Sequence, residues 1–172
     1  MSKAEIQLKG TSSNSEVFAG IVTGQIAGLV MAIVVMLVFI LFLNKGPHFP
    51  VQVIGSLIIG ESALSGFHLS AFLIGLVLHQ LGPSLLWGIV YGLLAQKLAI
   101  NDNRKSVTLG IAVGVISMSG PYVLIPFLMK TIQGTDYWNQ QVPIMWDWAA
   151  HIIFGASFVL FPIIKNRLFK DN

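Results

Sequence analysis

The sequence predicts an all-α membrane protein with four transmembrane helices, arranged as two parallel-repeat helical hairpins. Hydrophobic residues make up 55% of the 172-residue chain and charged residues only 10%, whereas about a quarter of an ordinary soluble domain is charged. Mean hydropathy is +0.79. Four segments without Asp, Glu, Lys or Arg are each close to or above the roughly 20 residues that cross the hydrocarbon core. They use most of the chain, so we expect one integral membrane domain spanning residues 1–172.

The first span is predicted at residues 17–44, and the others at about 67–96, 106–129 and 148–164. The first follows a polar leader and continues in bulky residues to Leu43. A signal-peptide h-region is shorter and ends at a small-residue cleavage site. We therefore interpret this segment as a permanent span.

A shorter apolar run, PVQVIGSLIIGESALSG at residues 50–66, lies between the first two spans. Gly55 and Gly60 interrupt it, and its apolar part is too short to cross the bilayer. We expect a short interfacial or re-entrant helix in the first outer loop.

The basic residues predict the orientation. Lys45 and Lys130 fall on one side of the predicted spans. The other eight fall on the opposite side: Lys3, Lys9, Lys97, Arg104, Lys105, Lys165, Arg167 and Lys170. By the positive-inside rule both termini are cytoplasmic, and we expect a multi-pass protein of a bacterial or archaeal cytoplasmic (inner) membrane. The outer side then receives Glu61, Asp136, Asp147 and an aromatic belt of Tyr137, Trp138, Trp146 and Trp148.

Two short matches suggest an internal repeat. GIVTG at residues 20–24 corresponds to GIAVG at 110–114, and LLWG ending at Gly88 corresponds to IIFG ending at Gly155. If each hairpin starts and ends inside, the repeats are related by an axis along the membrane normal. The alternative is that apolar helices containing glycine resemble one another.

Glycines at intervals of four predict helix packing, because small residues let backbones approach closely in lipid. The stripes are Gly20, Gly24 and Gly28, then Gly88 and Gly92, then Gly110 and Gly114. We expect them to serve packing inside the bundle. The alternative is that the first stripe docks a helix of a partner.

Three histidines fall in the predicted spans: His68 at the outer edge of the second, and His79 and His151 farther inside. His79 precedes Gly82 and Pro83, and His151 precedes Gly155, so the two hold corresponding places in the predicted hairpins and lie in the outer half. Ligation of a b-type haem by two imidazoles, a metal site or a hydrogen bond to a quinone are possible uses. We expect instead neutral imidazoles bonded to helix neighbours, with no cofactor.

Several functions are disfavoured. The predicted spans carry no carboxylate or basic residue of the kind that ion-coupled transport uses. No phosphate-binding glycine loop, strand-to-helix nucleophile elbow or cysteine is present. The net charge of +3 is a topogenic signal rather than a nucleic-acid footprint. We expect neither a catalytic residue nor a nucleic-acid partner.

The segment HIIFGASFVLFPIIKNRL, residues 151–168, follows the aromatic outer loop and the GIAVG helix with its Pro121 interruption. It resembles the C-terminal half of YagU-like inner-membrane proteins and of similar small four-helix bacterial and archaeal proteins of unknown function. The resemblance starts at about His79. It implies a link to acid tolerance or to respiratory oxidases, with His79 and His151 as candidate family positions.

We therefore expect a non-catalytic accessory subunit of a multi-subunit membrane complex, of the respiratory, terminal-oxidase type. Its partners would be other membrane subunits and lipids, contacted through the glycine stripes and the Trp-rich outer loop. The alternative is a self-contained homo-oligomeric channel or a stress- or acid-tolerance protein.

The orientation is testable by cysteine labelling, because the chain has no native cysteine. A cysteine at Ser13 or Asn172 should resist a membrane-impermeant thiol reagent in intact cells, while one at Gln140 should react. Labelling of Asn172→Cys from outside would reverse the orientation.

Overall fold

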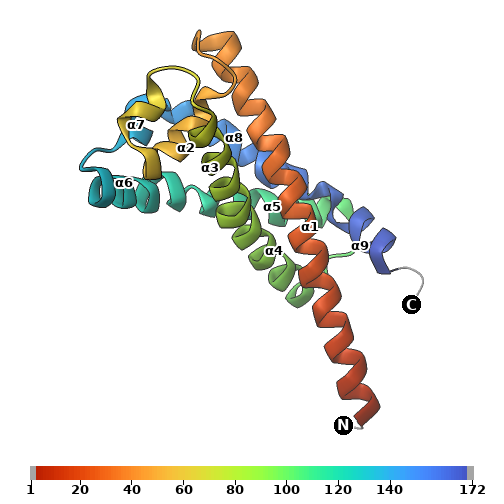
Figure 1. The fold of residues 1–172 in the computed structure, drawn as a ribbon. Helices are drawn as coiled ribbons and strands as arrows, with labels where there is room; N and C mark the ends of the chain where they lie inside the picture. Colours follow the sequence, from red (N-terminus) through yellow and green to blue (C-terminus); the bar gives the residue numbers. More distant parts are fainter. Residues whose placement is uncertain (1–2, 170–172) are drawn as a thin grey trace.

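The computed structural model describes residues 3–169, with side chains from Asn14 onward, and every element in that range is helical (Figure 1). Four stretches of helix within it are long and apolar enough to cross a membrane, and a shorter apolar helix lies between the first two. The predicted all-α class with four such helices is therefore confirmed. The stretches are Asn14–Phe42, Leu69–Lys97, Asn103–Gln133 and Ile144–Phe169.

Each long stretch except the first is built from several consecutive elements. The first is part of α1 (Lys3–Phe42). The second comprises α3 (Leu69–His79), the π-helix η2 (Gln80–Ser84) and α4 (Leu85–Lys97). The third comprises α5 (Asn103–Ser117), the π-helix η3 (Gly120–Leu124) and α6 (Ile125–Gln133). The fourth comprises α8 (Ile144–Ala156), the 3₁₀-helix η4 (Ser157–Leu160) and α9 (Phe161–Phe169). The connecting elements are α2 (Phe49–Ile59), η1 (Glu61–Leu64) and α7 (Tyr137–Gln141).

Glycines bring α1 against α4 and α5 against α8. A Cβ added to Gly24 would lie 2.6 Å from the carbonyl oxygen of Ser84 and 2.7 Å from the Cα of Gly88. All seven glycines of the predicted stripes face another helix of the same chain, six of them against its backbone and Gly28 against the side chains of Gln80 and Ser84. The first stripe is therefore occupied by α4 and η2, and the idea that it docks a partner's helix is wrong.

The two glycine contacts resemble each other. Gly88 lies against Gly20 and Gly24, and Gly155 lies against Gly110 and Gly114. One turn earlier along each second helix, the carbonyl of Ser84 faces Gly24 and that of His151 faces Gly114. Ser84 therefore holds the place that corresponds to His151. The prediction that His79 corresponds to His151 is wrong, because the packing register follows the glycines.

Each of the two π-helices contains a Gly–Pro pair, Gly82–Pro83 in η2 and Gly120–Pro121 in η3. Proline lacks the N–H of the helical ladder, and π-helical turns commonly accommodate such an interruption. In Figure 1 the third stretch bends between α5 and α6. Both Gly–Pro pairs are thus accommodated in π-helical turns.

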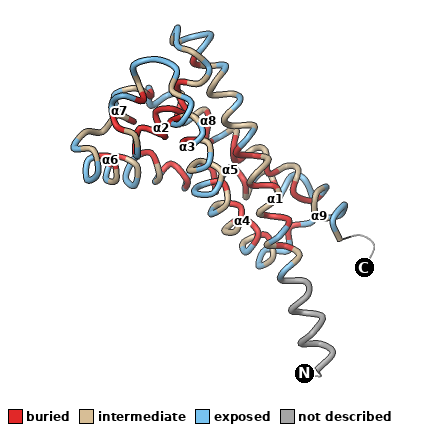
Figure 2. Tube along the Cα trace, in the orientation of Figure 1, coloured by how far each residue is buried: buried red, intermediate tan, exposed pale blue. Residues whose placement is uncertain are grey.

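The buried side chains form two clusters. One cluster includes residues of α1, α4, α5, α8 and α9 and centres on Tyr91. The Tyr91 ring stacks on Phe158 with ring centroids 4.1 Å apart, and its hydroxyl shares a 2.6 Å hydrogen bond with Ser106. The other lies between α1, α2, α6 and α7 and includes Phe39, Met129 and Trp138. Figure 2 shows buried positions both along the long helices and in α2.

The short helix α2 is mostly buried and packs against α3, α6 and α7. Its Gln52 side chain is fully buried and bonds three main-chain groups, donating to the carbonyls of Ala63 and Gly66 and accepting from the N–H of His68. One amide thereby holds α2, η1 and the start of α3 together.

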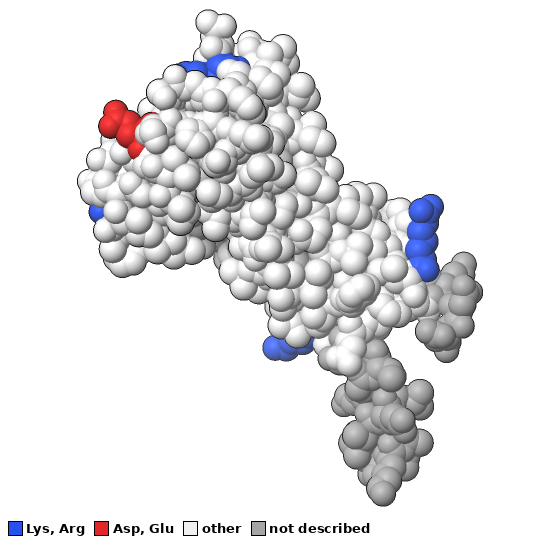
Figure 3. Space-filling view, viewed as in Figure 1, with Lys and Arg blue, Asp and Glu red and all other residues white. Residues whose placement is uncertain are grey.

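The surface carries few charges between the ends of the long helices. On the face in Figure 3, charged side chains lie at the extremities and the area between them is uncharged. Lys165 of α9, which is partly exposed, forms an ion pair with the buried Glu16 of α1. Two helices that are far apart in sequence are thus joined at the end of the bundle near Tyr91.

The glycine contacts predict a large penalty for added bulk. Gly24→Leu should lower the free energy of unfolding by at least about 2 kcal/mol, because backbone atoms of another helix cannot move aside as a side chain would. Ala112→Leu, at an exposed position of α5, is the matched control and should change it by less than about 0.5 kcal/mol. Unfolding in mixed micelles measures both. Equal effects would contradict the assignment of Gly24 to a backbone contact.

Candidate functional site

A cavity of about 560 Å³ lies between the two buried clusters. All four long stretches of helix line it, and so do α2 and α7. Its wall is mainly apolar, with Met31, Trp87 and Phe154 among the lining side chains. We name it the histidine cavity, because two histidines of the predicted spans, His79 and His151, contribute to its wall.

His79 is the last residue of α3, where the π-helix η2 begins. Its Nδ1 lies 3.1 Å from Oε1 of the Gln80 side chain. Gln80 is held in turn by Gln25 of α1: each donates its side-chain amide to the other's main-chain carbonyl, at 3.2 Å and 2.9 Å. The Ser84 hydroxyl donates to the same Oε1 at 3.1 Å. The orientation of His79 is thus fixed by a network that joins α1 to η2.

His151 lies on α8 and is 8% exposed. Its Nδ1 is 2.9 Å from the main-chain carbonyl oxygen of Asp147, one turn earlier. The Asp147 carboxylate is farther from this nitrogen, at 3.7 Å. The expected bond of His151 to a helix neighbour is present.

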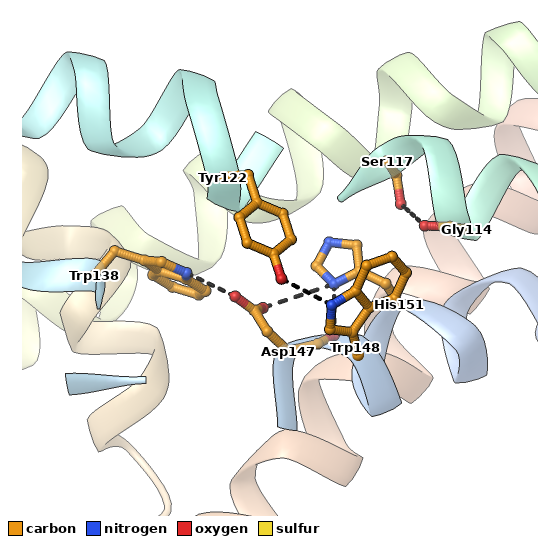
Figure 4. Close-up of polar contacts among 7 residues, drawn as sticks. All are labelled: Gly114, Ser117, Tyr122, Trp138, Asp147, Trp148 and His151. Carbon is orange, nitrogen blue, oxygen red and sulfur yellow. Dashed lines mark hydrogen bonds and ion pairs between the residues drawn. The ribbon is translucent and has the colours of Figure 1, made fainter. Parts of the chain in front are cut away.

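Asp147 is a buried carboxylate, only 6% exposed. The indole Nε1 of Trp138 donates to its Oδ2 at 2.9 Å, as Figure 4 shows. The sequence places Asp147 in the outer loop, before the predicted fourth span, whereas the structure places it in a helix. Pro143 precedes a helix that begins at Ile144, so Asp147 stands in the first turn of α8. Trp138 gives the buried carboxylate a partner, without which its burial would be costly.

The other three long stretches also include ionisable residues near their ends, where the sequence predicted none. Each helix continues past the predicted span into a polar flank at one end or both: the first begins at Asn14, the second ends at Lys97, and the third extends from Asn103 to Gln133. In these three stretches the residues are Glu16, Lys97, Arg104, Lys105 and Lys130, and the fourth stretch also includes Lys165 and Arg167.

A second, smaller cavity of about 40 Å³ adjoins the site. Asp147 and Trp146 of α8 line it together with Pro50 and Val51 of α2. His79 and Trp138 line both cavities. His79 therefore lies between the larger and the smaller cavity.

The remaining histidines lie elsewhere. His68 caps α3, accepting at Nδ1 from the N–H of Ala71 at 3.3 Å. His48 packs edge-on against the ring of Phe67, with centroids 5.0 Å apart. Neither lines either cavity, so the structure brings together only His79 and His151.

Two features of the site have no clear signal in the sequence. The partnership of Gln80 with Gln25 spans 55 positions, and Trp138 is one of several tryptophans in a segment typical of an interfacial belt. The four-residue spacing of Asp147 and His151 does place them on one helix face. Their burial could be found only from the tertiary packing.

The site has few ligands for a metal. Among residues 14–169, whose side chains are described, no group of three or more His, Asp or Glu side chains is placed to hold a metal ion. Its means of binding are a shaped apolar volume and a small set of hydrogen-bonding groups, which suit an organic ligand.

Comparison of the chain with protein families, with curated proteins and with solved structures finds no match. The resemblance to YagU-like proteins therefore stays a prediction.

The bond between Trp138 and Asp147 should be measurable as a coupling energy. Trp138→Phe removes the donor and should cost about 1–3 kcal/mol of unfolding free energy, because a buried carboxylate loses its partner. Trp148→Phe is the matched control: its indole donates to Tyr122 at the surface, and its loss should cost less than about 1 kcal/mol.

A double-mutant cycle with Asp147→Asn, followed by unfolding in mixed micelles, should give a coupling of about 1 kcal/mol or more. Additive effects of Trp138→Phe and Asp147→Asn would contradict the assigned bond.

Proposed function

We propose that the protein is a non-catalytic accessory subunit of a membrane complex and holds a lipid-soluble ligand of the quinone class in the histidine cavity. The observation that carries the proposal is that imidazoles from two separate helices, His79 and His151, line one largely apolar cavity. An apolar cavity with a few fixed polar groups suits a ligand with an apolar body and a hydrogen-bonding head.

The size of the cavity supports a small organic ligand. Sites for such ligands enclose roughly 300–1,000 Å³, and the histidine cavity holds about 560 Å³. Leu81, Leu86 and Leu124 line it and are also exposed on the outer surface of the helices. A ligand dissolved in the lipid would reach the cavity past these side chains.

In the same proposal the four long helices cross a bacterial or archaeal cytoplasmic membrane as two parallel hairpins, with both termini inside. The distribution of basic residues supports this orientation. The short helix α2 would be re-entrant, because a helix buried against α3, α6 and α7 has the protein partners that lipid-facing turns lack. The histidine cavity then lies in the outer half of the membrane.

Contact with other subunits is assigned to the outer half of α1. Its glycines face inward, whereas a row of large apolar side chains at intervals of four is exposed: Leu29, Ile33, Leu37 and Leu41. In the proposed complex this row faces another subunit or lipid.

Ligand binding is testable with the purified protein in lipid nanodiscs. A short-chain quinone or its reduced form should bind saturably in titration calorimetry. Removing both imidazoles with His79→Leu and His151→Leu should weaken binding by about tenfold or more, because each hydrogen bond contributes about 1 kcal/mol. His48→Leu, outside the cavity, is the control and should bind normally.

The accessory role is tested separately by gentle solubilisation of the endogenous protein. It should migrate on native gels with other membrane subunits and carry an extractable lipid-soluble quinone. Migration only as itself or as a homo-oligomer would overturn the accessory role.

A further inference from the structure

We propose that the histidine cavity selects hydrogen-bond donors, so that its ligand presents a hydroxyl group, as a hydroquinone does, rather than a quinone carbonyl. This inference rests on the proposed function and names the chemical form of the ligand. The preference for a donor follows from the hydrogen bonds of the cavity lining, in which most N–H and O–H groups already donate to other groups of the protein.

The orientation of the Gln80 side-chain amide is fixed by its hydrogen-bond partners. Its Nε2 lies 3.2 Å from the main-chain carbonyl of Gln25, which can only accept a hydrogen bond. The NH₂ group therefore points toward α1. The amide oxygen, Oε1, is left to face His79 and the Ser84 hydroxyl.

The Gln80 amide in turn determines which ring nitrogen of His79 carries the proton. Because Gln80 Oε1 can only accept, the His79 Nδ1 that lies 3.1 Å from it must carry the hydrogen. A neutral imidazole has one N–H, so the Nε2 of His79 is a bare acceptor. A second proton would place a charge at membrane depth, which costs a few kcal/mol.

His151 repeats the arrangement on another helix. Its Nδ1 lies 2.9 Å from the main-chain carbonyl of Asp147 and therefore carries the hydrogen of the neutral ring. In Figure 4 the other ring nitrogen, Nε2, is on the edge of the ring away from Asp147. Trp138 occupies one oxygen of that carboxylate, and the other is 3.7 Å from Nδ1, beyond hydrogen-bond length.

Both Nε2 atoms remain open. In the part of the chain whose side chains are described, the only polar side-chain atom that is enclosed without a partner is an oxygen of Glu16. The two Nε2 atoms have no protein partner and are not enclosed, and their rings line the cavity. Each of these two Nε2 atoms therefore offers a ligand a lone pair that can accept a hydrogen bond.

Two of the three serine hydroxyl groups that line the cavity are also used as donors. Ser84 donates to Gln80 and Ser117 to the carbonyl of Gly114, the latter at 2.6 Å. Each then offers a ligand only oxygen lone pairs. Of the described lining groups, Trp87 and Ser119 keep a donor hydrogen that no hydrogen bond in the structure uses. A ligand hydroxyl can donate to the first set and accept from the second, whereas a carbonyl can only accept.

The experiment compares three ligands that share one ring and one side chain: a short-chain hydroquinone, its quinone and its dimethyl ether. Binding to the wild-type protein in nanodiscs is measured by titration calorimetry, anaerobically and with reductant for the hydroquinone. We expect the hydroquinone to bind about tenfold or more tightly than either other compound, which corresponds to about one net hydrogen bond.

His79→Phe should lower the affinity for the hydroquinone toward that for the ether and leave the ether unchanged, because the ring volume is kept and one of the acceptors is lost. His48→Phe is the matched control and should alter none of the three. A quinone that binds as tightly as the hydroquinone overturns this inference and leaves the proposed function standing. Failure of all three to bind overturns the proposed function itself.

The tautomers can be read directly from ¹⁵N NMR of wild-type protein with labelled histidine, which does not depend on the folding of a variant. We expect Nδ1–H tautomers for His79 and His151, with a shift of their Nε2 resonances on addition of hydroquinone. An Nε2–H tautomer at either residue overturns the inference. So does a Soret band or stoichiometric zinc in the purified protein, since the same lone pairs would then ligate a metal.

Discussion

The close approach of helix backbones at glycine is the constraint on which the rest of this structure depends. In lipid, apolar side chains gain little by leaving their surroundings, so helices associate mainly through dispersion contacts and hydrogen bonds between them. Here Gly24 and Gly88 bring α1 onto α4, and Gly110 and Gly155 bring α5 onto α8. Beyond these contacts each of two helices contains a Gly–Pro pair in a π-helical turn. Both turns line the histidine cavity, which therefore lies where close packing gives way to interrupted helix.

The polar groups around the cavity are organised as pairs across helices. Gln25 and Gln80 exchange amide bonds, and Trp138 reaches Asp147. A buried amide or carboxylate without a partner would destabilise the fold. The same pairs fix which atoms of His79 and His151 remain free, so packing and site chemistry have one origin.

The sequence predicted much of this architecture because its signals are local. Charge-free runs located the four long helices, and glycines at intervals of four marked their contact faces. Prediction failed where the position or partner of a residue depends on tertiary contacts. Asp147 was placed in a loop because hydropathy counts its charge and cannot see the indole of Trp138. His79 was matched with His151 through neighbouring small residues, whereas the backbone contact matches His151 with Ser84. Gln80 has no distinguishing signal, since its partner is on a helix more than fifty residues away.

The fully buried Gln52 has a consequence for how the chain is assembled during synthesis. The helix that carries it, α2, is made before α6 and α7, which later cover it. All three main-chain groups that Gln52 bonds lie within the following 16 residues. Gly55 and Gly75 also seat α2 on α3 without help from later segments. The α2–α3 unit can therefore form as soon as α3 has emerged, and it can present a finished surface to the C-terminal half when that half folds.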